Sequence, residues 1–163
     1  MAYPSDVPPP SIGFLVWHLS MKWRARMDRA LAPLDLTATH YALLASLYGL
    51  TRGGRQPSQR ELADSSSLEP MYVSKLVRLL EKRGLVKRST NPADTRAVAL
   101  TITDRGAEVV SAARAITQDL QTEHLLPLGG VDSERSLRLQ EELRILLRHT
   151  IGDAAAAQPP EGP

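Results

Sequence analysis

Apolar residues repeat at helical spacing along most of this chain and alternate as in a strand only once. Val98, Leu100 and Ile102 alternate with other residues, and with residues 85–88 they predict a hairpin around the turn residues 91–94. Elsewhere the three- and four-residue spacing predicts helices that begin at or near Ser11, Thr37, Ser58, Pro70, Asp104 and either Asp132 or Ser133. The expected fold class is mainly α with a small β-wing.

The stretch 57–106 organises the rest of the chain. Ser58 and Glu61 have the spacing of a capping box, in which each side chain accepts from the other residue's backbone amide. A serine run then interrupts the helix, because serine side chains compete for backbone hydrogen bonds. Pro70 suits a first helical position and Gly84 suits a helix C-terminus. Helix, break, helix and hairpin predict a winged helix-turn-helix, whose second helix can lie in a DNA major groove.

The second helix of this motif has two different faces. An apolar stripe at positions i, i+3, i+4 and i+7 predicts the buried side, formed by Val73, Leu76, Val77 and Leu80. A second row with the same spacing is polar and mostly basic, and consists of Met71, Ser74, Lys75, Arg78 and Lys82. On an isolated helix the second row would be a solvated face, but the adjacent hairpin favours a DNA-reading face.

The helix and hairpin resemble a known family in their residues. Pro92-Ala93-Asp94-Thr95-Arg96 matches the wing signature of that family, a proline followed by Asp-x-Arg. The family's recognition helix, first wing strand and wing exit are matched by Leu68, Val73, Ser74, Leu76, Val77, Leu80, Glu81, Gly84, Leu85, Val86, Arg88, Leu100, Ile102, Thr103 and Gly106. The chain is thus similar to MarR-family transcriptional regulators, more weakly so over the wider span from about Ile12 to Thr150.

Three features depart from the pattern of the family. Residues 69–72 read Glu-Pro-Met-Tyr where small hydroxyl residues are more usual, and Leu79 stands where a charged residue is more usual. The family often has glutamine at the position of His40, which is expected here to be a capping or surface histidine. These departures leave the expected fold intact and affect the operator sequence that the protein would read.

The candidate DNA contacts come from the basic helix face, the capping serine and the wing. Ser74 is expected on phosphate, Lys75 and Arg78 on bases or phosphate, and Met71 or Tyr72 on a thymine methyl group. The complete set of candidates is Ser58, Met71, Tyr72, Ser74, Lys75, Arg78, Lys82, Arg88, Asp94 and Arg96.

The wing tip carries a separate hypothesis. Arg96 follows a turn that projects from the core, so it is expected in the adjacent minor groove, whose negative potential attracts arginine. Asp94 would be repelled by phosphates, and the resemblance implies that it orients the wing by pairing with an arginine. The alternative is an ordinary surface salt bridge between Asp94 and Arg96, which contributes under ~1 kcal/mol to stability.

The two ends of the chain predict a homodimer. The helix over 11–32 has a second apolar row, Phe14, Trp17 and Met21, beyond the stripe that a surface helix needs. Packing the helices of 11–32 and 104–150 against a second copy would use this surface and give the two-fold symmetry of a palindromic operator. Residues 11–151 are expected to form a single domain, between a disordered arm over 1–10 and a disordered tail over 152–163.

A small-molecule effector is implied by the resemblance, because members of the family often bind small aromatic acids between the dimer helices and the DNA-binding unit. Aromatic and soft residues in the corresponding part of the chain are Trp17, Met21, Tyr41 and Tyr48. The alternative is that these side chains only fill the core.

Composition and charge are consistent with a DNA-binding protein. The chain has 163 residues, 42% of them hydrophobic, and a net charge of +2. Between Lys75 and Arg96 seven basic residues face two acidic ones, so this segment carries +5 and the remainder −3. A basic stripe on a nearly neutral chain is typical of phosphate binding. The absence of cysteine excludes disulfides, thiolate zinc sites and thiol redox sensing.

Other function classes find less support. The four histidines are scattered and no phosphate loop or nucleophile elbow is present, so neither an enzyme nor a cofactor is expected; a zinc sensor built from converging histidines has no ligand-like spacing behind it. The N-terminus lacks signal-peptide features and no apolar run reaches the ~20 residues of a membrane span, so a cytoplasmic protein is expected. The remaining alternative is a winged helix that binds another protein.

Overall fold

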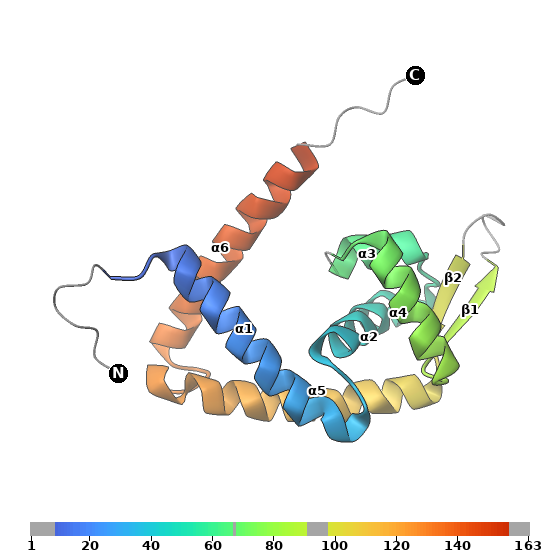
Figure 1. The fold of residues 1–163 in the computed structure, drawn as a ribbon, viewed down its shortest axis with the longest axis horizontal. Helices are drawn as coiled ribbons and strands as arrows, with labels where there is room; N and C mark the ends of the chain where they lie inside the picture. Colours follow the sequence, from blue (N-terminus) through green and yellow to red (C-terminus); the bar gives the residue numbers. More distant parts are fainter. Residues whose placement is uncertain (1–8, 67, 91–97, 157–163) are drawn as a thin grey trace. The chain divides into compact units, whose positions relative to one another are not determined.

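The computed structural model describes residues 9–66, 68–90 and 98–156. Its α-helices, shown in Figure 1, are α1 (Ile12–Leu31), α2 (Ala38–Leu50), α3 (Gln59–Ser66), α4 (Pro70–Lys82), α5 (Asp104–Leu125) and α6 (Glu134–Ala156). Short 3-10 turns are η1 (Ala32–Leu34), η2 (Arg52–Gly54) and η3 (Leu126–Leu128), and the strands are β1 (Val86–Thr90) and β2 (Val98–Ile102). The mainly α fold class with a β-wing is confirmed.

The chain separates into two compact units between Thr117 and Gln118, inside α5. The sequence indicated one domain over 11–151 and gave no sign of this division. The first unit contains α1 to α4, the two strands and the start of α5. The second contains the end of α5, η3 and α6. No helix of the described residues is long and apolar enough to cross a membrane.

The helix starts in the first unit follow local rules. Ser11 caps α1 by accepting from the Phe14 amide at 3.2 Å, and Thr37 caps α2 by accepting from the His40 amide at 3.2 Å. Pro33 lies in the 3-10 turn that follows α1, where a proline cannot continue the helix ladder. The predicted starts of α1 and α2, and the end of α1, are confirmed.

The helix-turn-helix is formed by α3 and α4. The hydroxyl of Ser66, the last residue of α3, donates to the Leu62 carbonyl oxygen at 2.7 Å. The helix therefore includes Ser65 and Ser66 of the serine run that was predicted to interrupt it, and it ends at Ser66. Pro70 begins α4, and Gly84 follows its end with φ of 70°, a left-handed conformation that favours glycine. The predicted apolar stripe of α4 is buried, with Val73, Leu76, Val77 and Leu80 at most 6% exposed.

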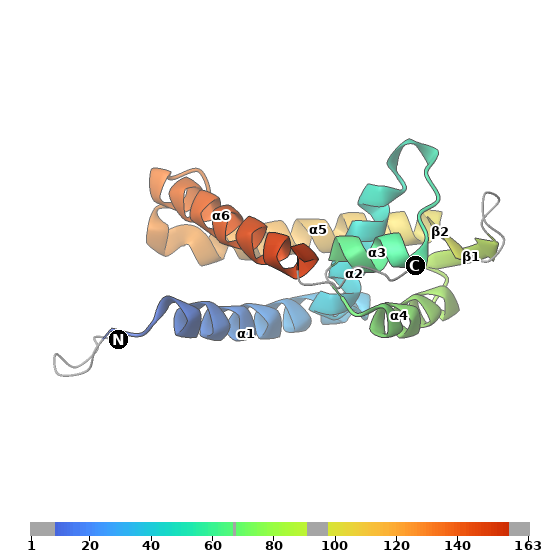
Figure 2. The ribbon, with the colours of Figure 1, turned by 90° about the horizontal axis from the view of Figure 1, so that it is seen from above.

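The wing begins where α4 ends, and its two strands lie side by side in both views (Figures 1 and 2). Val86 pairs with Ile102 and Thr90 with Val98 in an antiparallel register. The prediction that β2 alternates is wrong in detail, because Ala99 and Leu100 are both fully buried. The Leu100 amide donates to the Pro57 carbonyl at 2.8 Å, so the residues before α3 cover the second edge of β2.

The wing leads directly into α5 through a tight joint. The Thr103 hydroxyl donates to the Gly84 carbonyl at 2.8 Å and accepts from the Gly106 amide at 3.0 Å. The Thr103 amide donates to the Leu85 carbonyl at 3.1 Å. Gly106 lies so close to Leu85 that a Cβ at this position would overlap the Leu85 carbonyl oxygen. The start of α5 is therefore fixed to the end of α4, and Thr103 caps the helix that was predicted to begin at Asp104.

The second unit is stabilised by its own polar turn. The hydroxyls of Ser133 and Ser136 donate to the Gly130 carbonyl at 2.9 and 2.7 Å, and the Ser133 oxygen accepts from the Ser136 amide at 3.2 Å. Gly129 and Gly130 both have positive φ, which closes the turn between η3 and α6. The backbone of α6 continues to Ala156, past residue 152 where the sequence predicted the disordered tail to begin, because an alanine-rich sequence has high helix propensity.

Candidate nucleic-acid interface

The outer face of α4 presents three cations to solvent. Lys75, Arg78 and Lys82 are exposed, and none of them forms an ion pair within the described part of the chain. Cations without carboxylate partners remain available to phosphates, which is how a helix gains affinity for duplex DNA. The proposed reading face is therefore chemically free to bind an anion.

The first turn of α4 presents apolar surface beside these cations. Met71 is 76% exposed and Tyr72 is 43% exposed, while Ser74 is half-buried. Glu69 at the cap position makes no side-chain hydrogen bond to the helix, as glutamate is a poorer N-cap than serine or aspartate. Leu79, which departs from the family pattern, is also exposed on α4, at 41%.

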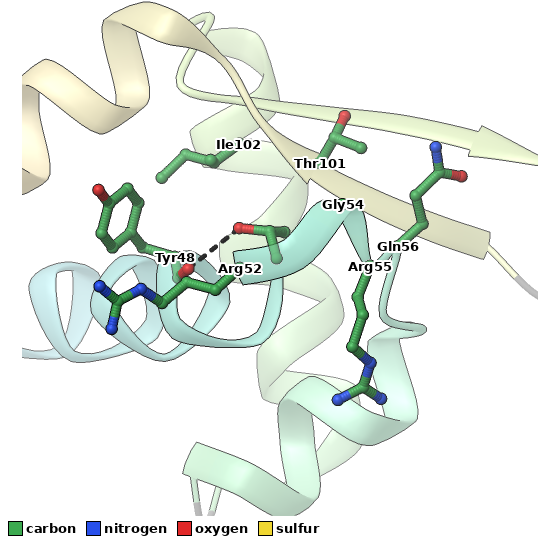
Figure 3. A pocket seen from close by; sticks show the side chains of 8 residues that line it. Tyr48, Arg52, Gly54, Arg55, Gln56, Thr101 and Ile102 are labelled. Atoms are coloured by element: carbon green, nitrogen blue, oxygen red, sulfur yellow. Dashed lines mark hydrogen bonds between the residues drawn. The ribbon is translucent and has the colours of Figure 1, made fainter.

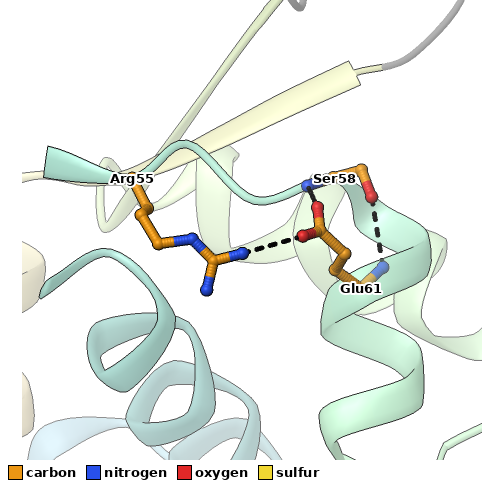
Figure 4. A network of polar contacts seen from close by, with 3 residues as sticks. All are labelled: Arg55, Ser58 and Glu61. Carbon is orange, nitrogen blue, oxygen red and sulfur yellow. Dashed lines mark hydrogen bonds and ion pairs between the residues drawn. The ribbon is translucent and has the colours of Figure 1, made fainter.

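Ser58 and Glu61 form the predicted capping box at the start of α3 (Figure 4). The Ser58 amide donates to the Glu61 carboxylate at 2.7 Å, and the Ser58 hydroxyl accepts from the Glu61 amide at 3.1 Å. Arg55 adds an ion pair to Glu61 at 3.1 Å. The pKa of Glu61 is lowered, first by the hydrogen bond from the Ser58 backbone, then by the Ser58 side chain and by Arg55. The Ser58 hydroxyl is therefore already used in the cap.

Arg88, a predicted DNA contact, forms an ion pair with a residue of α4. Its Nε donates to the Glu81 carboxylate at 2.7 Å, and both side chains are about one-third exposed. This ion pair ties the first wing strand to the recognition helix. Glu81 and Arg88 were both part of the resemblance, but their mutual contact was not read from the sequence, because it depends on the angle between α4 and β1.

Two predicted site residues at the wing tip, Asp94 and Arg96, lie outside the described residues. Their roles stay predictions. The strands on either side, β1 and β2, are paired along their full length up to Thr90 and Val98.

The candidate effector residues divide into two groups. Tyr41 and Tyr48 of α2 line a cavity of about 290 Å³ between α2 and α5, and the hydroxyls of Tyr41 and Thr117 are hydrogen-bonded at 3.2 Å. Trp17 and Met21 of α1 do not line it and are more than half exposed. The structure therefore brings together the two tyrosines, not the four residues predicted.

Two arginines complete this cavity, and sequence reasoning missed both. Arg52 and Arg114 line it together with Tyr41, Tyr48 and Ser111, and neither forms an ion pair with another described residue. A second, more open hollow of about 470 Å³ shares Tyr48 and Arg52 with it (Figure 3). Arg52 follows α2 and Arg114 lies far along the chain in α5, so no local spacing could have paired them.

Metal ligands do not gather in the described residues. In residues 9–66, 68–90 and 98–156 no group of three histidine, aspartate or glutamate side chains is placed to hold a metal ion. His40 takes part in the cap of α2, since its Nδ1 accepts from the Thr37 amide at 3.2 Å. This contact is one of the two roles that the sequence suggested for His40.

A capped helix-turn-helix, a basic outer face on its second helix and a two-stranded wing define the winged helix-turn-helix class of DNA-binding proteins. Comparisons with known proteins agree. Residues 36–98 match the MarR family model. The uncharacterized HTH-type transcriptional regulator YdcH of Bacillus subtilis (strain 168) is 40% identical over 113 residues, which cover 69% of this chain and 77% of YdcH.

Solved structures share the fold at lower identity. The S. aureus MepR–DNA complex matches with a TM-score of 0.75 and 23% identity, over 86% of this chain and 99% of MepR. CouR from Rhodococcus jostii RHA1 bound to p-coumaroyl-CoA matches with a TM-score of 0.71 and 24% identity, over 96% of this chain and 100% of CouR. This chain belongs to the MarR family and is a transcriptional regulator with a winged helix-turn-helix.

Proposed function

We propose that this regulator is a homodimeric repressor that binds a palindromic operator and is released by a small aromatic anion. The observation that carries the proposal is the unpaired basic face of α4, held on a helix-turn-helix whose opposite face is fully packed. The MepR structure, a complex with DNA, supports the same use of this fold.

The homodimer is supported by exposed apolar side chains on α1 and on α6. On α1 six large apolar side chains are between 45% and 58% exposed: Phe14, Leu15, Val16, Trp17, Leu19 and Met21. On α6 six large apolar side chains are between 37% and 61% exposed: Leu137, Leu139, Leu143, Ile145, Leu146 and Leu147. Apolar surface of this extent is typical of an interface. Sedimentation of the wild type as a monomer at micromolar concentration would refute the dimer, and Leu19→Glu should shift a dimer towards monomer.

The proposed DNA contacts fall into reading and positioning groups. Lys75 and Arg78 would reach bases or phosphates in the major groove, with Met71 or Tyr72 against a thymine methyl group. Ser74 and Lys82 would contact phosphates, and Ser58 would act by holding α3 in place through the capping box. Arg88, which is held by Glu81, would mainly orient the wing. Arg96 would enter the minor groove, with Asp94 orienting it.

The proposed effector site is the cavity between α2 and α5. Its two tyrosines offer aromatic surface, and the unpaired Arg52 and Arg114 would neutralise a carboxylate. CouR, solved with p-coumaroyl-CoA, supports an aromatic ligand for a protein of this fold. A ligand that binds the DNA-free conformation better would shift the population away from DNA by that difference in affinity. Calorimetry with aromatic carboxylates tests the site, with Arg114→Met expected to weaken binding; no binding by any of them would leave the residues as packing.

The decisive experiment is selection of bound sequences from random duplex DNA, followed by affinity measurements over a salt series. We expect a palindromic site and a steep salt dependence from phosphate contacts. Arg78→Ala should weaken discrimination at one base position by about 1–3 kcal/mol. Arg29→Ala removes the same charge from α1 and should leave affinity unchanged. No selected sequence and no salt dependence would favour a winged helix that binds another protein instead.

A further inference from the structure

A histidine completes the capping box at the start of α2. The Thr37 hydroxyl accepts from the His40 amide, and in return the Thr37 amide donates to His40 Nδ1, both at 3.2 Å. Glutamate or glutamine usually fills the return position of such a box. Here the acceptor is an imidazole nitrogen, which titrates near neutral pH.

The direction of this hydrogen bond fixes the charge state of the ring. A backbone N–H can only donate, so His40 Nδ1 must offer a lone pair and the ring proton must be on Nε2. Protonation would place an N–H group against the Thr37 N–H group and remove this half of the box. It would also add positive charge at a helix N-terminus, where the helix dipole disfavours cations.

The charged groups around His40 come from three elements. Arg83 follows α4, Asp35 follows η1 and Asp28 is on α1, while Arg24 of α1 reaches the neighbouring Thr39 hydroxyl at 3.1 Å. The pKa of His40 is lowered from its ordinary value of 6.5, first by burial and then by Arg83, against the opposing effects of Asp35 and Asp28. The neutral ring is therefore the form that this environment favours.

The same residues hold α1, α2 and α4 together. The Ala38 amide of α2 donates to Asp28 Oδ1 of α1 at 2.7 Å. Arg83 donates to the Leu34 carbonyl at 3.2 Å and pairs with Asp35 at 3.1 Å. The start of α2 is thus the place where the helix with the exposed apolar face is joined to the recognition helix, and His40 lies inside it.

We propose that His40 makes this joint acid-sensitive, so that protonation of its ring opens the capping box, loosens α1 from the DNA-binding unit and weakens DNA binding. The effect on DNA rests on the proposed function, whereas the effect on the joint does not. The device senses a fall in pH directly, without a ligand.

The sign of the effect follows from linkage. Well above pH 6.5 His40 is neutral in the folded and the unfolded chain, and the full contribution of the box is present. As the pH falls below this value, the unfolded chain binds the proton before the folded chain does, so stability decreases. The decrease is complete only below the lowered pKa of the folded state.

The test compares the wild type with His40→Gln, which keeps an acceptor at the return position but does not titrate. Urea unfolding between pH 8 and pH 5 should show the wild type losing stability relative to His40→Gln as the pH falls, by roughly 2- to 30-fold in the folding equilibrium constant. Ring resonances of His40 should titrate below the ordinary histidine pKa.

Affinity for the selected operator over the same pH range gives the second readout. The wild type should lose affinity on acidification more steeply than His40→Gln. Parallel stability profiles for the two proteins would overturn the acid-sensitive joint. If the stability profiles of the two proteins diverge with pH but their operator affinities change in parallel, the proposed effect on DNA binding is wrong. If neither protein binds DNA at any pH, the proposed function is wrong, while the acid sensitivity of the joint is still supported by the stability data.

Discussion

The DNA-binding unit is joined to its flanking helices at two places that differ in chemistry. At the α4–α5 joint, Thr103 and Gly106 contact the backbone of Gly84 and Leu85, and no ionisable side chain takes part in these contacts. At the α1–α2 joint, the contacts are made by Asp28, Asp35, His40 and Arg83.

Because of this difference, the two joints should respond differently to pH and salt. A joint made of neutral hydrogen bonds and close backbone contacts contains no titrating group, so its strength should not change with pH or salt. A joint made of charged and titratable side chains depends on both. The α4–α5 joint is therefore the fixed joint and the α1–α2 joint is the adjustable joint. Mutations should act on the two differently.

The largest effect is expected at the fixed joint. Gly106→Ala places a methyl group against the Leu85 carbonyl and 2.7 Å from Ile102 Cγ1, so backbone must move. Overpacking of this kind costs about 1–3 kcal/mol and sometimes more, and a backbone obstacle favours the upper end. The free energy of unfolding in urea measures it. Gly49→Ala, with nothing within 4 Å of the new methyl, should be neutral or stabilising; equal costs for the two variants would contradict the close approach.

A smaller loss is expected for Thr103→Ala. The change removes the cap of α5 and the hydrogen bond to the Gly84 carbonyl, at a cost of about 1–2 kcal/mol. Because neither contact titrates, the cost should be the same at pH 5 and pH 8 in unfolding experiments. Thr103→Ser should recover most of it, and a cost that varies with pH would remove the contrast between the joints.

Arg83→Met should have a moderate effect at the adjustable joint. It keeps the apolar stem of the side chain but loses the hydrogen bond to Leu34 and the ion pair to Asp35, at about 1 kcal/mol. Arg83 also lowers the pKa of His40, so its removal should raise that pKa. Proton resonances of the His40 ring over a pH series measure the shift; a downward shift would show that burial changes outweigh the charge.

The smallest effect on stability is expected for Asp35→Asn. Asp35 has a left-handed backbone with φ of 56°, which asparagine also tolerates, and its carboxylate is almost fully exposed. Loss of such an exposed ion pair should cost under ~0.5 kcal/mol. Asp35 opposes the lowering of the His40 pKa, so Asp35→Asn should lower it further. Opposite pKa shifts for Arg83→Met and Asp35→Asn, in the same titration, would establish the electrostatic character of this joint.

Much of the fold could be predicted from the sequence, because the deciding interactions span only three or four residues. Ser11, Thr37, Ser58 and Thr103 each cap a helix whose start the sequence predicted within one residue. The apolar stripe of α4 is buried because its spacing places every member on one face. The basic face of the candidate site followed from the same spacing.

Other features depend on which elements meet, and only the tertiary structure decided them. Ala99 is buried because residues 57 and 58, from before α3, lie along β2. Arg88 contacts Glu81 because β1 returns towards α4, and Arg52 meets Arg114 at one cavity because α2 and α5 lie together. Local propensity carries no information about such distant pairs. The sequence therefore determined the helices, most of their caps and the basic outer face of α4, whereas packing decided which charges pair and which remain free, and placed His40 where we propose that it responds to acid.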